Sequence, residues 1–205
     1  MKPCQKAGDI IWLQQAESTN RSIREASSGL DNLSVIAAVE QTAGRGQGTH
    51  TWYSTPGKNL TFSLLVRPVQ LKAADMILLT CATTLGIRDY LHGHGVEARI
   101  KWHNDIWVGD RKICGILIEN ILDGELIAES IIGIGLNLNE EGWPTDLPNP
   151  VSLKELTGKE YDLRRELPSL HSKICRRFAL LDSVAGRKEL QEEFGKYVFR
   201  LHEEP

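Results

Sequence analysis

The sequence predicts a mixed α/β (α+β) domain, with a mixed central β-sheet that is flanked by helices. Three observations predict this class. Residues 34–40 form a near-continuous apolar run of strand length, as expected for a strand buried on both faces. Residues 71–92 carry apolar residues at helical spacing, and glycine-containing turns join strand-like segments further along the chain. The irregular order of strands and helices does not fit a plain doubly wound sheet.

The first third of the chain contains three expected strands and one helix. A short strand is predicted at residues 9–15, and Ser18-Thr19-Asn20 offers side chains that can cap a helix reaching to about residue 28. A second strand covers residues 34–40, and a third covers residues 59–67. The stretch between them, residues 42–57, is too polar to pack and too rich in glycine to be helical.

The middle of the chain begins with one long helix, predicted over residues 71–92 and ended by the glycines at 93 and 95. The segments that follow are a strand at 97–102, strands at 106–108 and 112–119 joined by the turn 109–111, a turn at 122–124, and a strand at 125–139. A proline-rich piece at 142–150 then leads into a C-terminal third that is predicted to be helical from Ser152.

Composition limits the class of protein. The chain has 205 residues, 41% of them apolar, so one domain can bury a sizeable core. Its 24 basic and 27 acidic residues give a net charge of −3, which excludes a strongly basic nucleic-acid binder. No apolar run reaches the ~18 residues of a membrane-spanning helix, and the first residues do not form a signal peptide. The cysteines, at 4, 81, 114 and 175, form no CxxC pair, so free thiols and a cytoplasmic location are expected.

The strand at residues 125–139 has two different faces. One face is mostly apolar and is expected to enter a core; it carries Leu126, Ala128, Ser130, Ile132, Ile134, Leu136 and Leu138. The other face carries Gly133, Gly135, Asn137 and Asn139. Glycine weakens a strand, so its presence indicates either close approach by a ligand, to which the asparagines would offer amides, or room for a large neighbouring side chain. The pattern leaves both explanations open.

The loop Gly44-Arg45-Gly46-Gln47-Gly48 is a second candidate site. Its backbone N–H groups and the Arg45 guanidinium could cradle an anion, although the loop is neither a Walker A motif nor a dinucleotide fingerprint. On pattern alone a solvated loop is the better explanation, but the length of the loop favours a function. Trp52, near its end, can either stack on a ligand ring or pack the loop down.

The third candidate lies around the turn at 109–111. Lys101, Asn104 and Asp105 leave one strand and Lys112 starts the next, so these groups can lie close together. Two lysines, an amide and a carboxylate near a glycine loop suit a nucleotide, its phosphates and Mg²⁺. The alternative is ordinary charge on a surface hairpin. The histidines show no metal-ligand spacing, and no catalytic triad can be argued from residue order.

Taken in order, these segments resemble the biotin–protein ligases. The matching pieces are Ser18-Thr19-Asn20, the run from Glu40 to Gln47, Trp52 with Ser54, Pro56-Gly57-Lys58-Asn59-Leu60, Lys101-Trp102-x-Asn104-Asp105-Ile106, Lys112-Ile113-x-Gly115-Ile116-Leu117-Ile118-Glu119, and the run from Gly133 to Asn139. Each motif is weak, but the ordered set is specific and extends from about residue 10 to residue 200. The resemblance implies the class II synthetase-like catalytic domain of that family over residues 1–205.

The resemblance also implies a two-step reaction. Biotin and MgATP form biotinyl-adenylate, and the biotinyl group then passes to one lysine of a carboxyl-carrier protein. Ser18, Thr19, Gln41, Gly44, Arg45, Lys112 and Gly115 match positions that bind biotin. Arg45, Gly46, Gln47, Trp52, Lys101, Asn104, Asp105, Lys112, Gly135 and Asn137 match the ATP and adenylate side, with Asp105 as a candidate Mg²⁺ ligand. Lys112 and Arg45 are the expected catalytic residues, because positive donors stabilise charge that develops at the α-phosphate.

The chain also departs from the family pattern. His103 replaces a common proline, and the glycine loop has one arginine, Arg45, where relatives have more. The N-terminal winged helix and the C-terminal β-barrel of other members are both missing, so DNA binding is not expected. A homodimer is one expected assembly, since members often pair through a sheet edge. The alternative functions are a lipoate- or octanoate-transferring relative and a degenerate biotin or adenylate sensor.

Overall fold

The structure is a computed structural model that describes residues 8–102, 104–147 and 149–199. Eight strands form one mixed sheet in the order β1-β2-β3-β7-β6-β5-β4-β8. Their bounds are β1 Ile10–Ala16, β2 Val35–Gln41, β3 Leu60–Val66, β4 Arg99–Lys101, β5 Asp105–Val108, β6 Arg111–Asp123, β7 Leu126–Leu136 and β8 Val198–Phe199. The outermost pairs, β1–β2 and β4–β8, are parallel, and the other neighbours are antiparallel. The predicted mixed sheet is confirmed.

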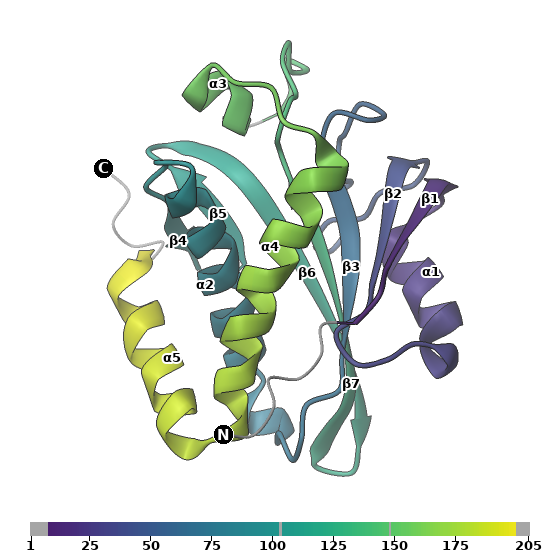
Figure 1. Cartoon of the computed structure of the whole chain (residues 1–205), viewed down its shortest axis with the longest axis vertical. Helices are drawn as coiled ribbons and strands as arrows, with labels where there is room; N and C mark the ends of the chain where they lie inside the picture. Colours follow the sequence, from purple (N-terminus) through teal and green to yellow (C-terminus); the bar gives the residue numbers. More distant parts are fainter. Residues whose placement is uncertain (1–7, 103, 148, 200–205) are drawn as a thin grey trace.

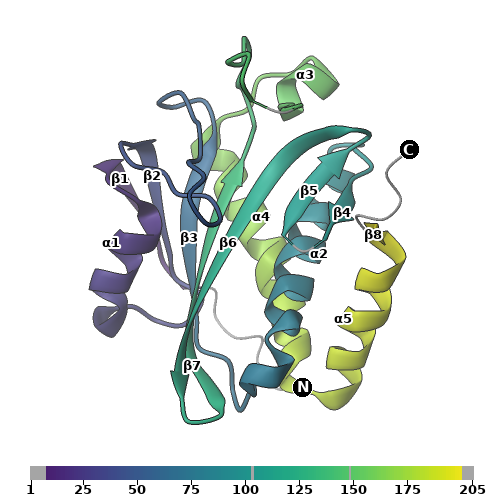
Figure 2. The same cartoon turned by 180° about the vertical axis from the view of Figure 1, so that it is seen from behind.

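Helices lie on both faces of this sheet. Three of them, α2 (Ile77–Gly93), α4 (Leu163–Phe178) and α5 (Val184–Tyr197), cover one face and bury the main core (Figure 1). The short helix α1 (Thr19–Ala26) packs on the opposite face, where Ile23 meets Ile36, Leu65 and Ile131. On the same face as α1, the loop between β2 and β3 passes in front of the sheet (Figure 2).

The long central helix begins later than predicted, at Ile77 instead of residue 71. The backbone of Leu71 accepts a hydrogen bond from Ile127, and Lys72 forms an isolated bridge with Leu126. A 3-10 turn, Ala73–Asp75, then leads into the helix. Leu71 is buried against the start of β7, so it continues the apolar pattern of α2 although it is not helical.

In the hairpin formed by β6 and β7, the first strand is longer and the second shorter than predicted. β6 extends to Asp123, whereas β7 ends at Leu136, so Asn137 and Asn139 leave the strand. The predicted alternation holds from Ser130 to Leu136, but Leu126 and Ala128 are exposed and Ile127 is buried in their place. The ladder shifts register between Ile121 and Leu122, and such a bulge bends the strand and re-aims its side chains.

The C-terminal third is helical as predicted, with two additions. A short helix α3, Leu153–Thr157, precedes α4, and a 3-10 turn, Ala179–Asp182, precedes α5. The chain then adds β8, which pairs with β4 and was not predicted. Cys4, His103 and Leu201 lie outside the described residues. None of the helices within the described ranges is long and apolar enough to cross a bilayer.

Candidate functional site

A cavity of about 440 Å³ lies beside the start of α1. This volume lies within the usual range of ligand pockets. The cavity is lined by residues of α1, the β2–β3 loop, β5, β6, β7 and the segment after β7. The predicted site residues that line it are Ser18, Thr19, Gln41, Arg45, Gly46, Gln47, Trp52, Asn104, Asp105, Lys112, Gly115, Gly135 and Asn137. Gly44 and Lys101 are not among the lining residues.

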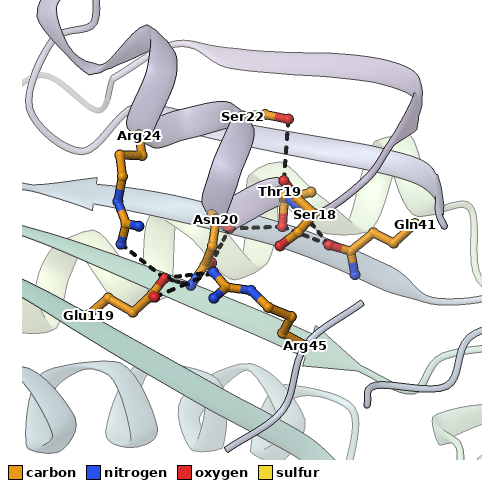
Figure 3. Close-up of polar contacts among 9 residues, drawn as sticks. Ser18, Thr19, Asn20, Ser22, Arg24, Gln41, Arg45 and Glu119 are labelled. Atoms are coloured by element: carbon orange, nitrogen blue, oxygen red, sulfur yellow. Dashed lines mark hydrogen bonds and ion pairs between the residues drawn. The ribbon is translucent and has the colours of Figure 1, made fainter. Parts of the chain in front are cut away.

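The start of α1 forms one wall. Ser18 is the N-cap, with an extended backbone, yet its side chain makes no capping hydrogen bond. The side chain of Gln41 instead accepts a hydrogen bond from the first helical N–H. Its Oε1 lies 2.8 Å from the backbone N of Thr19 and 3.1 Å from Thr19 Oγ1 (Figure 3). The N-cap thus falls within the predicted group Ser18-Thr19-Asn20, but the Ser18 side chain does not cap the helix, and its buried hydroxyl lies at the cavity wall.

The same helix end is bonded into the sheet. The hydroxyl of Ser63, on β3, lies 2.8 Å from Thr19 Oγ1 and 2.5 Å from Asn20 Oδ1. Asn20 in turn donates from Nδ2 to Glu119 on β6 at 2.8 Å. Thr19 and Asn20 are both almost fully buried, so these bonds are shielded from water and fix the wall in place.

The glycine-rich loop is ordered as a small hairpin. Arg45 and Thr51 form a bridge, and the N–H of Gly46 donates to the carbonyl of His50 at 2.7 Å. Gly48 turns the chain with a φ of +58°, which an L side chain rarely adopts. The loop carries the half-exposed Arg45 side chain to the cavity, where its Nη2 lies 3.2 Å from Glu119 Oε2.

The glycines of β6 and β7 make room for Trp52. Gly115 and Gly135 are paired across the ladder. A Cβ added to Gly135 would lie 2.2 Å from Trp52 Cε2, and one added to Gly115 would lie 2.9 Å from Cζ3. Of the two explanations that the sequence left open for the glycines of β7, room for a large side chain is confirmed at Gly135. The indole forms part of the cavity lining, and its Nε1 is buried without a partner among the described residues.

The asparagines after β7 have different tasks. Asn139 is used by the fold, because its side chain exchanges two hydrogen bonds with the backbone of Tyr161. Asn137 donates from Nδ2 to the carbonyl of Val151 at 3.0 Å, while its Oδ1 is buried without a partner in the described part of the chain. A buried unpaired acceptor beside a cavity is costly unless a ligand donates to it. The side chain of Asn104, like that of Asn139, is hydrogen-bonded to the backbone, because its Nδ2 donates to the carbonyl of Ile116.

The β5–β6 hairpin supplies the charged end of the site. Lys112 Nζ lies 2.8 Å from Asp105 Oδ1, and both side chains are about 30% exposed, at 31% and 28%. The backbone of Lys112 is fixed by hydrogen bonds with Asn149 and Val151. Lys101 instead places its ammonium 4.5 Å from the ring centroid of Trp107, so the structure does not bring it to the cavity as predicted.

The described residues include no group of three or more His, Cys, Asp and Glu side chains that could hold a metal ion. Asp105 is the carboxylate at the cavity, and it is paired with Lys112. One paired carboxylate does not form a resident Mg²⁺ site. Mg²⁺ commonly uses one or two carboxylates together with substrate phosphates, so any metal here would arrive with such a substrate.

Several residues of the site were not predicted individually. Asn20 and Glu119 stood within matching motifs but received no role, and Ser63 lay unnoticed in an apolar strand. Further lining residues come from the loops, namely His50, Tyr53, Trp143, Leu147 and Pro150. Spacing along the sequence gives no signal for these residues, because the β2–β3 loop and the segment after β7 meet only in the folded chain.

Comparison with known proteins agrees with this geometry. Residues 12–137 match the biotin/lipoate A/B protein ligase family. The chain is 31% identical over 180 residues to biotin--[acetyl-CoA-carboxylase] ligase of Paracoccus denitrificans, covering 83% of this chain and 73% of that protein. It is 30% identical over 160 residues to the bifunctional ligase/repressor BirA of Bacillus subtilis, covering 75% of this chain and 48% of that protein. The chain thus spans about half the length of the curated BirA relatives from Bacillus.

The fold is shared with a solved structure, that of biotin protein ligase from Aquifex aeolicus in complex with biotin and ATP. The TM-score is 0.78 at 24% identity, and the match covers 93% of this chain and 78% of the other. At this identity the match establishes the fold.

Proposed function

Because this chain belongs to the biotin/lipoate A/B protein ligase family, we propose that it is an ATP-dependent biotin–protein ligase. In the first step a carboxylate oxygen of biotin attacks the α-phosphorus of ATP, pyrophosphate leaves, and biotinyl-5'-AMP forms. In the second step a lysine amine of a carboxyl-carrier protein attacks the acyl carbon, and AMP leaves. The observation that carries the proposal is a single cavity that combines two cations, Lys112 and Arg45, with the hydrogen-bonding groups of Thr19 and Gln41.

Lys112 is the proposed catalytic donor. Negative charge builds at the α-phosphate when the carboxylate attacks, and a preorganised ammonium stabilises that charge more in the transition state than in the ground state. The Lys112 backbone is held by two hydrogen bonds and its side chain by Asp105, which supports a fixed position for the charge. Lysine also neutralises repulsion between the biotin carboxylate and the phosphates.

The α1 wall is the proposed biotin end. Ser18, Thr19 and Gln41 offer hydroxyl and amide groups in a largely buried setting, which suits the ureido ring of biotin. Groups of this kind discriminate strongly between ligands. A ligand that leaves them without hydrogen bonds binds more weakly, because these groups lose water without gaining a partner. Gly44 and Gly115 belong to the same end in this proposal. Gly44 contributes through Gln41, whose Nε2 lies 3.2 Å from where a Cβ of Gly44 would be.

The Trp52 side is the proposed adenylate end. Its indole and the unpaired Oδ1 of Asn137 supply a flat apolar surface and a hydrogen-bond acceptor, the two features that a purine with an exocyclic amino group requires. Gly46, Gln47, Gly135 and Asn104 complete this end. Mg²⁺ is part of the MgATP substrate in this proposal, with Asp105 as the nearby carboxylate.

Arg45 is proposed to cover the reactive intermediate. A mixed anhydride is hydrolysed by water, so a loop that closes over it keeps the acyl group for the acceptor lysine. We place the reaction in the cytoplasm because Cys81, Cys114 and Cys175 are all free thiols, as is usual in a reducing compartment. A lack of DNA binding and pairing into a homodimer stay predictions.

The test is biotin-dependent exchange of labelled pyrophosphate into ATP by the purified chain. The proposal expects exchange with biotin and a large loss of exchange in Lys112→Ala. Exchange supported by lipoate or octanoate but not by biotin would replace the proposal with the lipoate-transferring alternative. Biotin binding without any exchange, measured by calorimetry on the same sample, would reduce the function to a biotin sensor.

A further inference from the structure

Glu119 lies behind the cavity and joins three parts of the chain. It stands on β6 and does not itself line the cavity, and its side chain is 24% exposed. Asn20 and Arg24 of α1 approach it from one side, and Arg45 approaches it from the glycine-rich loop (Figure 3). The reaction proposed above does not use this carboxylate.

The contacts show a carboxylate that is held firmly. Arg45 Nη2 lies 3.3 Å from Oε1 and 3.2 Å from Oε2, and Arg24 Nη2 lies 3.3 Å from Oε2. Burial acts to raise the pKa of Glu119, but the hydrogen bond from Asn20 and the charges of Arg45 and Arg24 outweigh it and leave the pKa below its ordinary value. Glu119 is therefore ionised at neutral pH and attracts both guanidinium groups.

The orientation of Glu119 is fixed from inside the molecule. The Ser63 hydroxyl lies 2.5 Å from Asn20 Oδ1, which turns Nδ2 of the same amide toward Glu119. Gly133 leaves the space that this requires, because a Cβ there would lie 2.3 Å from Asn20 Oδ1. Ser63 is completely buried on β3. A chain of bonds thus runs from the sheet core through Asn20 to Glu119 and on to the loop.

We propose that Glu119 is a positioning residue, which holds the guanidinium of Arg45, and with it the glycine-rich loop, over the cavity before an anionic ligand enters. The identity of that anion, the phosphate of a nucleotide or acyl-adenylate, rests on the function proposed above. A guanidinium has five N–H donors, so Arg45 can keep Glu119 on Nη2 and offer other donors to the phosphate. Fixing the side chain in advance removes part of the entropy cost of ordering it on binding.

The first test needs no ligand. Trypsin cleaves after arginine, so the rate of cleavage at the Arg45–Gly46 bond reports how often the loop leaves the cavity. Glu119→Gln keeps the shape of the side chain and an acceptor for Asn20 but removes the charge. Cleavage at this bond, followed by mass spectrometry, should become about twofold to fivefold faster, as the loss of a modest ion pair implies.

Arg24→Gln is the matched control. It removes the other cation from the same carboxylate, but Arg24 does not line the cavity. Cleavage after Arg45 should stay at the wild-type rate in this variant. Equal rates in wild type, Glu119→Gln and Arg24→Gln would overturn the proposal, and so would equal acceleration in both variants, because the effect would then reflect the stability of α1.

The second test asks whether Glu119 acts through Arg45. The dissociation rate of biotinyl-adenylate should rise in Arg45→Ala and, about twofold to fivefold, in Glu119→Gln, while the double variant should release it no faster than Arg45→Ala alone. A purely structural role would make the two effects multiply, which would contradict the proposal. If biotinyl-adenylate does not bind the wild-type chain, the proposed function fails, whereas the trypsin test still decides the role of Glu119.

Discussion

The Gly135→Ala substitution would add a methyl group at a point occupied by the indole of Trp52. The new Cβ would lie 2.2 Å from Cε2 and 2.5 Å from Cζ2, whereas ordinary contacts begin at 3.4 Å. The ring, or the strand beneath it, must therefore move by about 1.2 Å or more. Overpacking of this kind typically costs about 1–3 kcal/mol. For a domain of this size, Tm should fall by roughly 2–4 °C for each kcal/mol.

A double-mutant cycle isolates the contact. Trp52→Ala removes the ring, so Gly135→Ala should cost little in that background, and the two substitutions should be strongly non-additive. Thermal unfolding followed by circular dichroism gives the four values without relying on Trp52 as the probe. Gly195→Ala in α5, where no atom lies within 4 Å of the added Cβ, is the control and should not destabilise the chain.

The result that would refute this reasoning is an equal loss of stability from Gly135→Ala with and without Trp52. The glycine would then be needed by the backbone of β7 and not by the indole. Gly115→Ala offers an intermediate case, because its Cβ would lie 2.9 Å from the same ring and 3.3 Å from the flexible end of Lys112. Its cost should be smaller than that of Gly135→Ala.

Two further predictions concern the charged end of the site and a buried histidine. Lys112→Ala should slow pyrophosphate release by roughly 10²-fold or more if the ammonium is a preorganised donor, and near-normal release would exclude that role. Burial lowers the pKa of His171, against the hydrogen bond between its Nε2 and the carbonyl of Leu33, so the unfolded chain takes up the proton first as the pH falls. Stability should therefore drop below about pH 6.5, and Tm measured between pH 7.5 and 5.5 should fall less in His171→Gln than in the wild-type chain. An unchanged pH dependence in that variant would show that other groups cause the acid sensitivity.

Much of the sheet could be predicted because its strands are locally distinctive. The apolar runs that became β2 and β3 and the glycine turn between β5 and β6 predicted these elements within a few residues. β8 was missed because two residues at the end of a helical segment carry no periodicity of their own. The start of α2 was misplaced because Leu71 is buried by pairing with β7, and burial looks the same in a helix and in an extended segment.

The candidate site could be predicted only where residue type itself indicates chemistry. Lys112, Arg45 and Gln41 stand at the cavity as their motifs suggested, whereas Lys101 carries the same charge but turns toward Trp107. The sequence could not show which partner a glycine accommodates, since that depends on pairing Gly115 with Gly135 under a loop from another part of the chain. The role of Glu119 could not be predicted either, because its partners on α1 and in the glycine-rich loop are far from it in the sequence.

The order in which strands follow one another along the chain has a kinetic consequence for the site. β5, β6 and β7 form a meander from Asp105 to Leu136, and it is joined by short turns, so its pairing requires little loop-closure entropy. β3 meets β7 only after a loop of some sixty residues closes, and β1 and β2 depend on β3. We expect the floor of the cavity to form as a local unit during folding, with the α1 wall and the glycine-rich loop joining it in a later, slower stage.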